Sequence, residues 1–185
     1  IGSNDQWGFE QEVLQKLPNC VTHTFDCTLA NNTPRRKPNS DNVKFYPYCI
    51  GDGTQNSDTN DESAVKTAKE FLPYSKLWEH ANIERAPKFL KIDVEGFEFG
   101  VIPHMLRSSP QETWPEQIMV EIHWATRMVD NRSVLRTRQA SEMALFFGQL
   151  FNQGGYLPVF VKYFEPHCPT CLEVLFVRVL CTSDS

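Results

Sequence analysis

Three motifs that would identify a chemistry directly are missing from this chain. It contains no G-x-G-x-x-G fingerprint and no P-loop, which weakens the interpretations as a dinucleotide-binding or phosphate-binding enzyme. It has no G-x-S-x-G elbow, so a serine nucleophile has little support. No apolar run reaches the roughly 20 residues that a membrane-spanning helix needs. A function therefore has to be argued from polar side chains placed by the fold.

Positive charge and paired cysteine motifs are also scarce. The net charge is -5, and the one basic cluster, Arg35-Arg36-Lys37, is short and flanked by prolines, which argues against a nucleic-acid partner. The six cysteines include a single C-x-x-C, at Cys168 and Cys171. Because no second C-x-x-C accompanies it, and because the strand-turn-helix context of a redox motif is lacking, it favours a loop pair or ordinary thiols.

The order of the elements predicts an α/β fold. The 185 residues are expected to form one domain over 1–185. Apolar periodicity predicts helices at 6–17, 62–80, 97–106 and 138–152, the second broken near Pro73. Continuous apolar runs predict strands at 21–25, 43–50, 89–92, 118–123, 156–164 and 172–180. We expect a mostly parallel sheet that closes with a C-terminal antiparallel hairpin.

Two details of these elements can be checked in the structure. Pro47 inside the run 43–50 predicts an edge strand or an irregularity. The helix at 138–152 is expected to bury one apolar stripe, formed by Met143, Ala144, Phe147, Leu150 and Phe151.

Acidic residues follow or end several of the predicted strands. They are Asp26, Asp52, Asp93 with Glu95, and Glu121, which the histidine His123 follows two positions later. Ligands bind at the carboxyl ends of the strands in an open α/β sheet, so these side chains predict a site along one rim. Taken singly, an Asp after a strand is more often a helix cap or a turn residue. Glu121 differs because it lies inside an apolar strand and needs a partner or a cavity.

Three chemistries suit such a rim, and the residues alone leave them open. An acid at a strand end can accept the hydroxyls of a ribose. Glu or His can act as a general base toward a substrate hydroxyl. Asp93, Glu121 and His123 together could hold a divalent cation, whose identity stays undetermined.

The motif Phe89-Leu90-Lys91-Ile92-Asp93-Val94-Glu95-Gly96-Phe97-Glu98, followed by "IMVEIH" at 118–123, Gly155-Tyr156 and "EVLFVR" at 173–178, resembles the FkbM-type methyltransferases. The opening "GSNDQWGFE" at 2–10, with Thr24-Phe25-Asp26, resembles a related methyltransferase-like branch still more closely. The resemblance implies a class I fold with a Rossmann-like sheet. It also implies S-adenosylmethionine as cofactor and methylation of a hydroxyl oxygen on a sugar or another small molecule.

The resemblance also implies roles for the cofactor-side residues. The loop formed by Gly2, Ser3 and Asn4 would lie under the methionine end of the cofactor, and Asp26 would bind the ribose. The adenine side would be contacted by Gly51 and Asp52, and the reacting methyl group would be faced by Asp93. The substrate side would be served by Glu95, Glu121 and His123.

One departure from the family keeps a second interpretation open. The first strand of such a fold precedes the glycine motif, and only Ile1 precedes it here, so we expect either that this strand, with any targeting segment, lies upstream or that another segment takes its place. The alternative is a catalytically inactive methyltransferase-like protein that serves as a structural or interaction subunit. The loops at 31–38 and 54–61 would then be candidate partner surfaces.

Overall fold

The computed structural model describes residues 1–29, 33–52, 71–127, 135–164 and 168–179. The predicted loop at 54–61 and the first part of the predicted helix at 62–80 lie outside these ranges. The chain divides into two compact units, residues 1–83 and 84–185, and each is described by itself. Among the described residues, no helix has both the length and the apolar character needed to cross a bilayer.

The described residues of unit 1 form two short parallel strand pairs and two helices. Helix α1 (Gly8–Lys16) precedes β1 (Thr22–Phe25), which pairs in parallel with β2 (Val43–Tyr46). A second parallel pair joins β3 (Cys49–Ile50) to β4 (Phe71–Leu72), and α2 (Tyr74–Ala81) follows.

Proline sets two boundaries in this unit. The predicted strand at 43–50 is interrupted between Tyr46 and Cys49, as expected around a Pro47 that has no N–H to donate. Helix α2 begins directly after Pro73, which has extended backbone, and ends at Asn82 in the left-handed conformation. A disulfide joins Cys27 to Cys49.

Unit 2 is built on a four-stranded mixed sheet in the order β5-β6-β10-β9. Strand β5 (Phe89–Ile92) runs parallel to β6 (Gln117–His123). Strand β10 (Cys168–Arg178) runs antiparallel to both β6 and β9 (Tyr156–Phe164), which confirms the C-terminal hairpin. A small antiparallel pair, β7 (Ala125–Arg127) and β8 (Leu135–Thr137), was not predicted.

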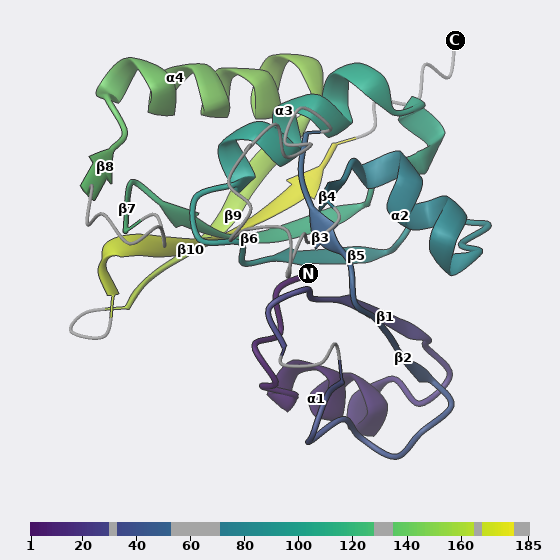
Figure 1. The fold of residues 1–185 in the computed structure, drawn as a ribbon. Coiled ribbons are helices and arrows are strands. Elements are labelled where there is room, and N and C mark those ends of the chain that lie inside the picture. The colour runs from purple at the N-terminus through teal and green to yellow at the C-terminus, as the bar shows by residue number, and fades with distance from the viewer. Residues whose placement is uncertain (30–32, 53–70, 128–134, 165–167, 180–185) are drawn as a thin grey trace, which may run out of the picture. The chain divides into compact units, whose positions relative to one another are not determined.

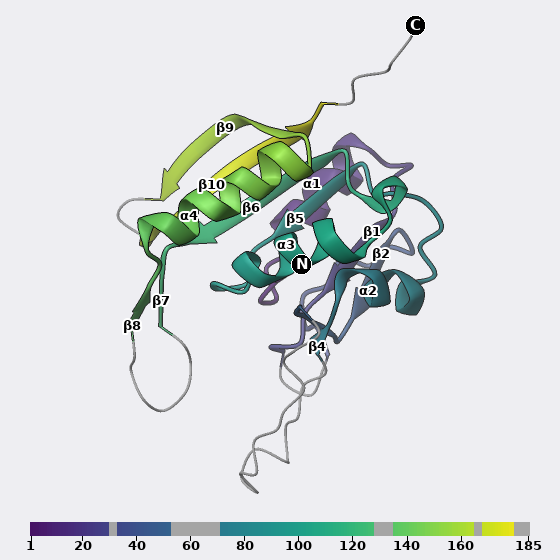
Figure 2. The ribbon, with the colours of Figure 1, turned by 90° about the horizontal axis from the view of Figure 1, so that it is seen from above.

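Two helices cover one face of this sheet (Figures 1 and 2). They are α3 (Glu98–Ser108), which continues through Pro103, and α4 (Ala140–Gly148), which ends in the π-helical turn η4 (Gln149–Gln153). A short 3-10 turn, η3 (Gln111–Thr113), leads from α3 to β6. Beneath the helices, Ile118, Val120 and Ile122 on alternate positions of β6 are completely buried. The sheet face with these residues therefore forms the core of unit 2.

The predicted buried stripe of α4 was only partly correct. Leu150 is fully buried, but Ala144 and Phe151 are exposed. Phe146, which was not predicted, is buried in their place because its ring packs 4.8 Å from that of Phe99 in α3.

Candidate functional site

The loop between β5 and α3 forms a tight turn that carries acidic side chains. Glu95 and Gly96 have left-handed backbone, with φ of 55° and 103°. The Gly96 N–H donates to Glu98 Oε2 at 2.8 Å, and Arg138 Nη2 donates to the Gly96 carbonyl at 3.2 Å. Glycine suits the second position because it adopts positive φ without steric cost. The turn is thus fixed from both sides, and its conformation places Glu95 in solvent, with 82% of its side chain exposed.

Glu98, at the first position of α3, is completely buried and holds His123 at the end of β6. Its Oε1 accepts the His123 backbone N–H at 2.6 Å and lies 3.2 Å from His123 Nδ1. A buried carboxylate is tolerated when its oxygens are satisfied in this way. The arrangement fixes the imidazole so that Nε2 is the ring nitrogen turned toward the other acids.

Two further carboxylates lie near the free side of this imidazole. His123 Nε2 is 3.5 Å from Glu121 Oε1 and 3.6 Å from Glu95 Oε2. Asp93 is 3.8 Å from Lys91 Nζ. We call the group Asp93, Glu95, Glu98, Glu121 and His123 the acidic cluster.

The acidic cluster shifts the proton affinity of its own members. Burial alone would lower the pKa of His123, but the hydrogen bond and charge of Glu98, helped by the charges of Glu95 and Glu121, raise it to about 9. Burial, with repulsion from Asp93, raises the pKa of Glu121. At neutral pH His123 therefore already carries its proton, which leaves Glu121 as the one of the two that can accept a proton.

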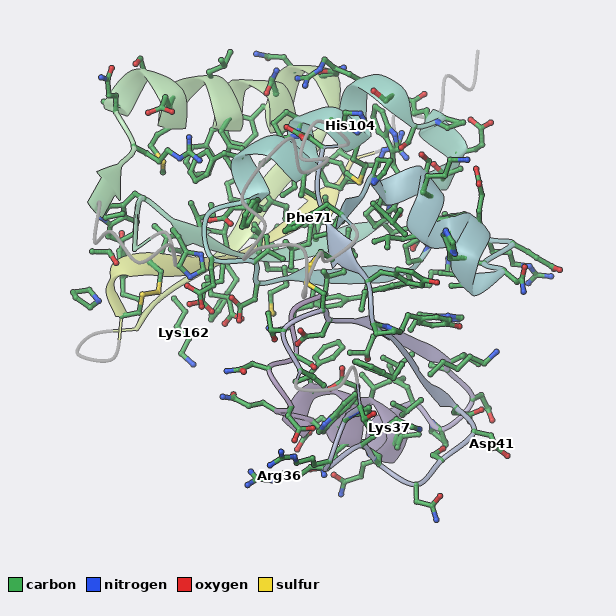
Figure 3. The ribbon with its side chains drawn as sticks, in the orientation of Figure 1. Arg36, Lys37, Asp41, Phe71, His104 and Lys162 are labelled. Atoms are coloured by element: carbon green, nitrogen blue, oxygen red, sulfur yellow. A yellow bond between two sulfur atoms is a disulfide. The ribbon has the colours of Figure 1, made fainter. Side chains whose placement is uncertain are left out.

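Strand register places Glu121 on the face of the sheet away from α3 and α4. Phe176 pairs with Ile118 and contacts Phe147 of α4, so those positions face the helices. Glu121 alternates with them and pairs with Glu173, which in turn pairs with Lys162. Figure 3 labels Lys162, whose side chain points away from the helical layer.

Strand β10 adds sulfur atoms beside this cluster. Cys171 is directly opposite His123 in the register, is almost completely buried, and has its Sγ 3.0 Å from Glu121 Oε1. Cys168 is joined to Cys171 by a disulfide. The C-x-x-C was expected in the hairpin loop; instead it begins β10, because a register shift between Cys168 and Leu172 lets the strand resume pairing earlier.

Among the described residues, two groups bring potential metal ligands within 4.8 Å of one another. One consists of Asp93, Glu95 and His123, and the other of Glu121, His123, Cys168 and Cys171. The predicted combination of Asp93, Glu121 and His123 is thus divided between two groups that share the histidine.

The remaining predicted site residues belong to unit 1. Asp26 follows β1 and is 4% exposed. Its Oδ2 accepts bonds from the Ser3 N–H at 2.8 Å, the Ser3 hydroxyl at 3.1 Å and the Asn4 N–H at 2.5 Å. Its Oδ1 accepts bonds from the Thr28 N–H at 2.7 Å and the Thr28 hydroxyl at 2.6 Å. Burial would raise the pKa of Asp26, but these bonds together lower it.

The loop before α1 is shaped by this carboxylate. Gly2 has a φ of 80° and donates its N–H to the Phe25 carbonyl at 3.0 Å, while Asn4 and Asp5 are also left-handed. Asp26 therefore joins the loop to the end of β1. Elsewhere in the unit, Gly51 follows β3 and donates its N–H to Leu72 at 2.9 Å, with Asp52 next to it.

The structure thus brings the substrate-side residues together with Asp93 in unit 2, and Gly2, Ser3, Asn4 and Asp26 together in unit 1. Sequence reasoning missed Glu98, although it stands in the quoted motif, because an acid at a helix start is usually a solvated cap. It also missed the proximity of Cys171 to His123, which only the strand register reveals.

Comparison with known proteins gives one positive result. A family model described as a methyltransferase domain matches residues 1–178. No curated protein and no solved structure matches significantly. Because the match covers nearly all of the 185 residues, this chain belongs to the methyltransferase-domain family.

Proposed function

We propose that this chain is an S-adenosylmethionine-dependent methyltransferase that methylates a hydroxyl oxygen of a sugar or another small molecule. The family match is the observation that carries the proposal. The resemblance to the FkbM-type branch supports the Rossmann-like fold, the cofactor and the hydroxyl acceptor. The acidic cluster, with one partly buried proton acceptor, Glu121, beside a fixed imidazole, supports catalysis over a purely structural role.

The loop before α1 can bind the ribose of a cofactor only if Asp26 exchanges one of its present hydrogen bonds. A carboxylate has about four lone-pair sites, and Asp26 already accepts five donors. A ribose hydroxyl therefore has to replace one of them. The hydroxyls of Ser3 and Thr28 are the natural ones to yield, because a hydroxyl can rotate to another acceptor. On this proposal Gly2, Ser3 and Asn4 form the loop beside the methionine end, and Gly51 and Asp52 serve the adenine side.

The cofactor supplies an already activated methyl group. The protein then has to orient the acceptor and remove its proton. We assign proton removal to Glu121, because its raised pKa brings it closer to neutrality than an ordinary carboxylate. His123 keeps its proton and stabilises the negative charge that collects beside it. Asp93 is assigned to the methyl side and Glu95, which is exposed, to acceptor binding.

The test is methyl transfer from radiolabelled S-adenosylmethionine to a panel of neutral glycosides and small alcohols. Glu121→Gln should lower kcat by about 10²–10⁴-fold, the usual contribution of a general base, with cofactor affinity unchanged. Glu116→Gln is the matched control, because Glu116 is exposed and lies just before β6, at the opposite end of that strand from His123. Cofactor binding without transfer to any acceptor would favour the inactive interaction subunit instead.

A further inference from the structure

The cysteine pair at the start of β10 lies against two residues that also bind transition metals. The ligand atoms of Cys168, Cys171, His123 and Glu121 all lie within 4.8 Å of one another. In a tetrahedral zinc site with bonds of about 2.0–2.3 Å, neighbouring ligand atoms are about 3.3–3.8 Å apart. To surround one ion, the ligand atoms that lie farthest apart have to move slightly closer together. The two sulfurs, once reduced, have to move from bonding distance to the longer spacing of a zinc site.

We propose that, when the Cys168–Cys171 disulfide is reduced, these two cysteines, His123 and Glu121 form a zinc-binding site. Two thiolates with one imidazole and one carboxylate are a ligand set that suits Zn²⁺. The site goes beyond methyl transfer and does not rest on it.

Glu98 makes this site more than a chance group of side chains. Metal-bound histidines commonly donate their second ring nitrogen to a carboxylate, which fixes the orientation of the ring. Here Glu98 Oε1 holds Nδ1 at 3.2 Å, so Nε2 is the nitrogen left for the metal. Glu98 is also held by the Gly96 N–H and the His123 backbone N–H, so this support is rigid.

The pairing of β6 with β10 fixes the position of the cysteine sulfurs relative to His123. Cys171 is paired with His123 across the sheet, and its Sγ is already 3.0 Å from Glu121. Cys168 lies beside this point because a disulfide joins it to Cys171, across a register shift in the pairing with β9 between Cys168 and Leu172. Cys171 and His123 are each less than 5% exposed, so a bound ion would be largely shielded from water.

The disulfide form and the zinc-bound form of the cysteine pair exclude each other. A thiol or phosphine reductant passes two electrons into the S–S bond and yields two thiols. Zn²⁺ then binds both sulfurs as thiolates, with release of their two protons, and also displaces any proton on His123 Nε2. Oxidation of the two thiolates by a disulfide reagent would restore the S–S bond and release the ion. The site is therefore sensitive to both redox state and metal.

Cobalt titration of the full chain tests this proposal. Reduced, metal-free protein should bind one Co²⁺ per chain with a thiolate-to-cobalt charge-transfer band, and Zn²⁺ should displace it. Unreduced protein should show no such band. Cys171→Ser should weaken binding at least about tenfold, and Glu98→Gln about 10- to 100-fold. The control is the double variant Cys27→Ser/Cys49→Ser, which removes the disulfide described in unit 1 and should keep the band.

A second measurement needs no variant. In reduced protein, Zn²⁺ should slow alkylation of Cys168 and Cys171, followed peptide by peptide, while alkylation of the exposed Cys20 stays unchanged. Equal alkylation with and without Zn²⁺, or a cobalt band that persists in Cys168→Ser/Cys171→Ser, would overturn the proposal. If the proposed function also holds, Zn²⁺ should inhibit transfer by the reduced protein, because it occupies Glu121; the cobalt spectrum is independent of that function.

Discussion

Replacing Asp26 with Asn tests whether this carboxylate organises the loop before α1. The substitution keeps the shape and one acceptor oxygen but turns the other into an NH₂ group, which cannot accept. If the NH₂ group faces Thr28, one backbone N–H loses its acceptor; if it faces Ser3 and Asn4, two do. A buried donor left unsatisfied costs about 1–3 kcal/mol, and the lost bonds were made to a charged group. We expect Asp26→Asn to lower the free energy of unfolding by about 2–3 kcal/mol.

The lowered pKa of Asp26 predicts how the stability loss in Asp26→Asn changes with pH. The pKa of Asp26 is lowered in the folded protein, so its charge stabilises the fold at pH values above the unfolded value of about 3.9. That contribution is lost as the pH falls through the lower, folded pKa. The difference between wild type and Asp26→Asn should therefore be full at neutral pH and shrink below about pH 4.

Urea unfolding followed by circular dichroism measures this difference. Asp41→Asn is the matched control, because Asp41 is exposed and belongs to the same unit (Figure 3). A surface substitution of that kind should change the unfolding free energy by less than about 0.5 kcal/mol. If Asp26→Asn unfolded at the same urea concentration as Asp41→Asn, the assignment of Asp26 as the organiser of this loop would be wrong.

Three further substitutions test the packing of unit 2 by urea unfolding. Tyr156→Phe removes a fully buried hydroxyl that donates to the Pro115 carbonyl at 2.6 Å, so it should cost about 0.5–1.5 kcal/mol. Gly154→Ala should cost about 1–3 kcal/mol, because the new Cβ would lie 2.9 Å from the Leu150 carbonyl oxygen. Glu98→Gln should cost about 1–3 kcal/mol, since its NH₂ group would face a backbone N–H, whereas the exposed Glu95→Gln should cost little. A loss for Glu95→Gln equal to that for Glu98→Gln would contradict the role given to the buried carboxylate.

The α/β class and the C-terminal hairpin could be predicted because strand runs and their spacing are local properties. The Pro47 interruption was predictable for the same reason, since proline lacks a donor wherever it stands. The inward position of Phe146 was not, because it depends on Phe99 in another helix. The early start of β10 depends likewise on a register shift that no local pattern encodes.

The candidate site could likewise be predicted only where it depends on local sequence. The run from Asp93 to Glu95 and the pair Glu121 and His123 stand out in sequence, since charged groups interrupt apolar strands there. Their ranking as proton acceptors could not be predicted, because the pKa of His123 is set by Glu98, which lies 25 positions away. The approach of Cys171 to the same histidine is a cross-strand contact and is visible only once the strands are paired.

Calorimetric titration of the full chain with S-adenosylmethionine tests the central claim most directly. We predict saturable binding of S-adenosylmethionine and of S-adenosylhomocysteine, weakened in Asp26→Ala and unchanged in Asp41→Asn. At about 100 times its Kd, either ligand should stabilise the fold by about 2.7 kcal/mol, which a thermal melt detects independently. A chain that shows neither heat of binding nor a shift in Tm with either ligand would contradict the assignment as a methyltransferase.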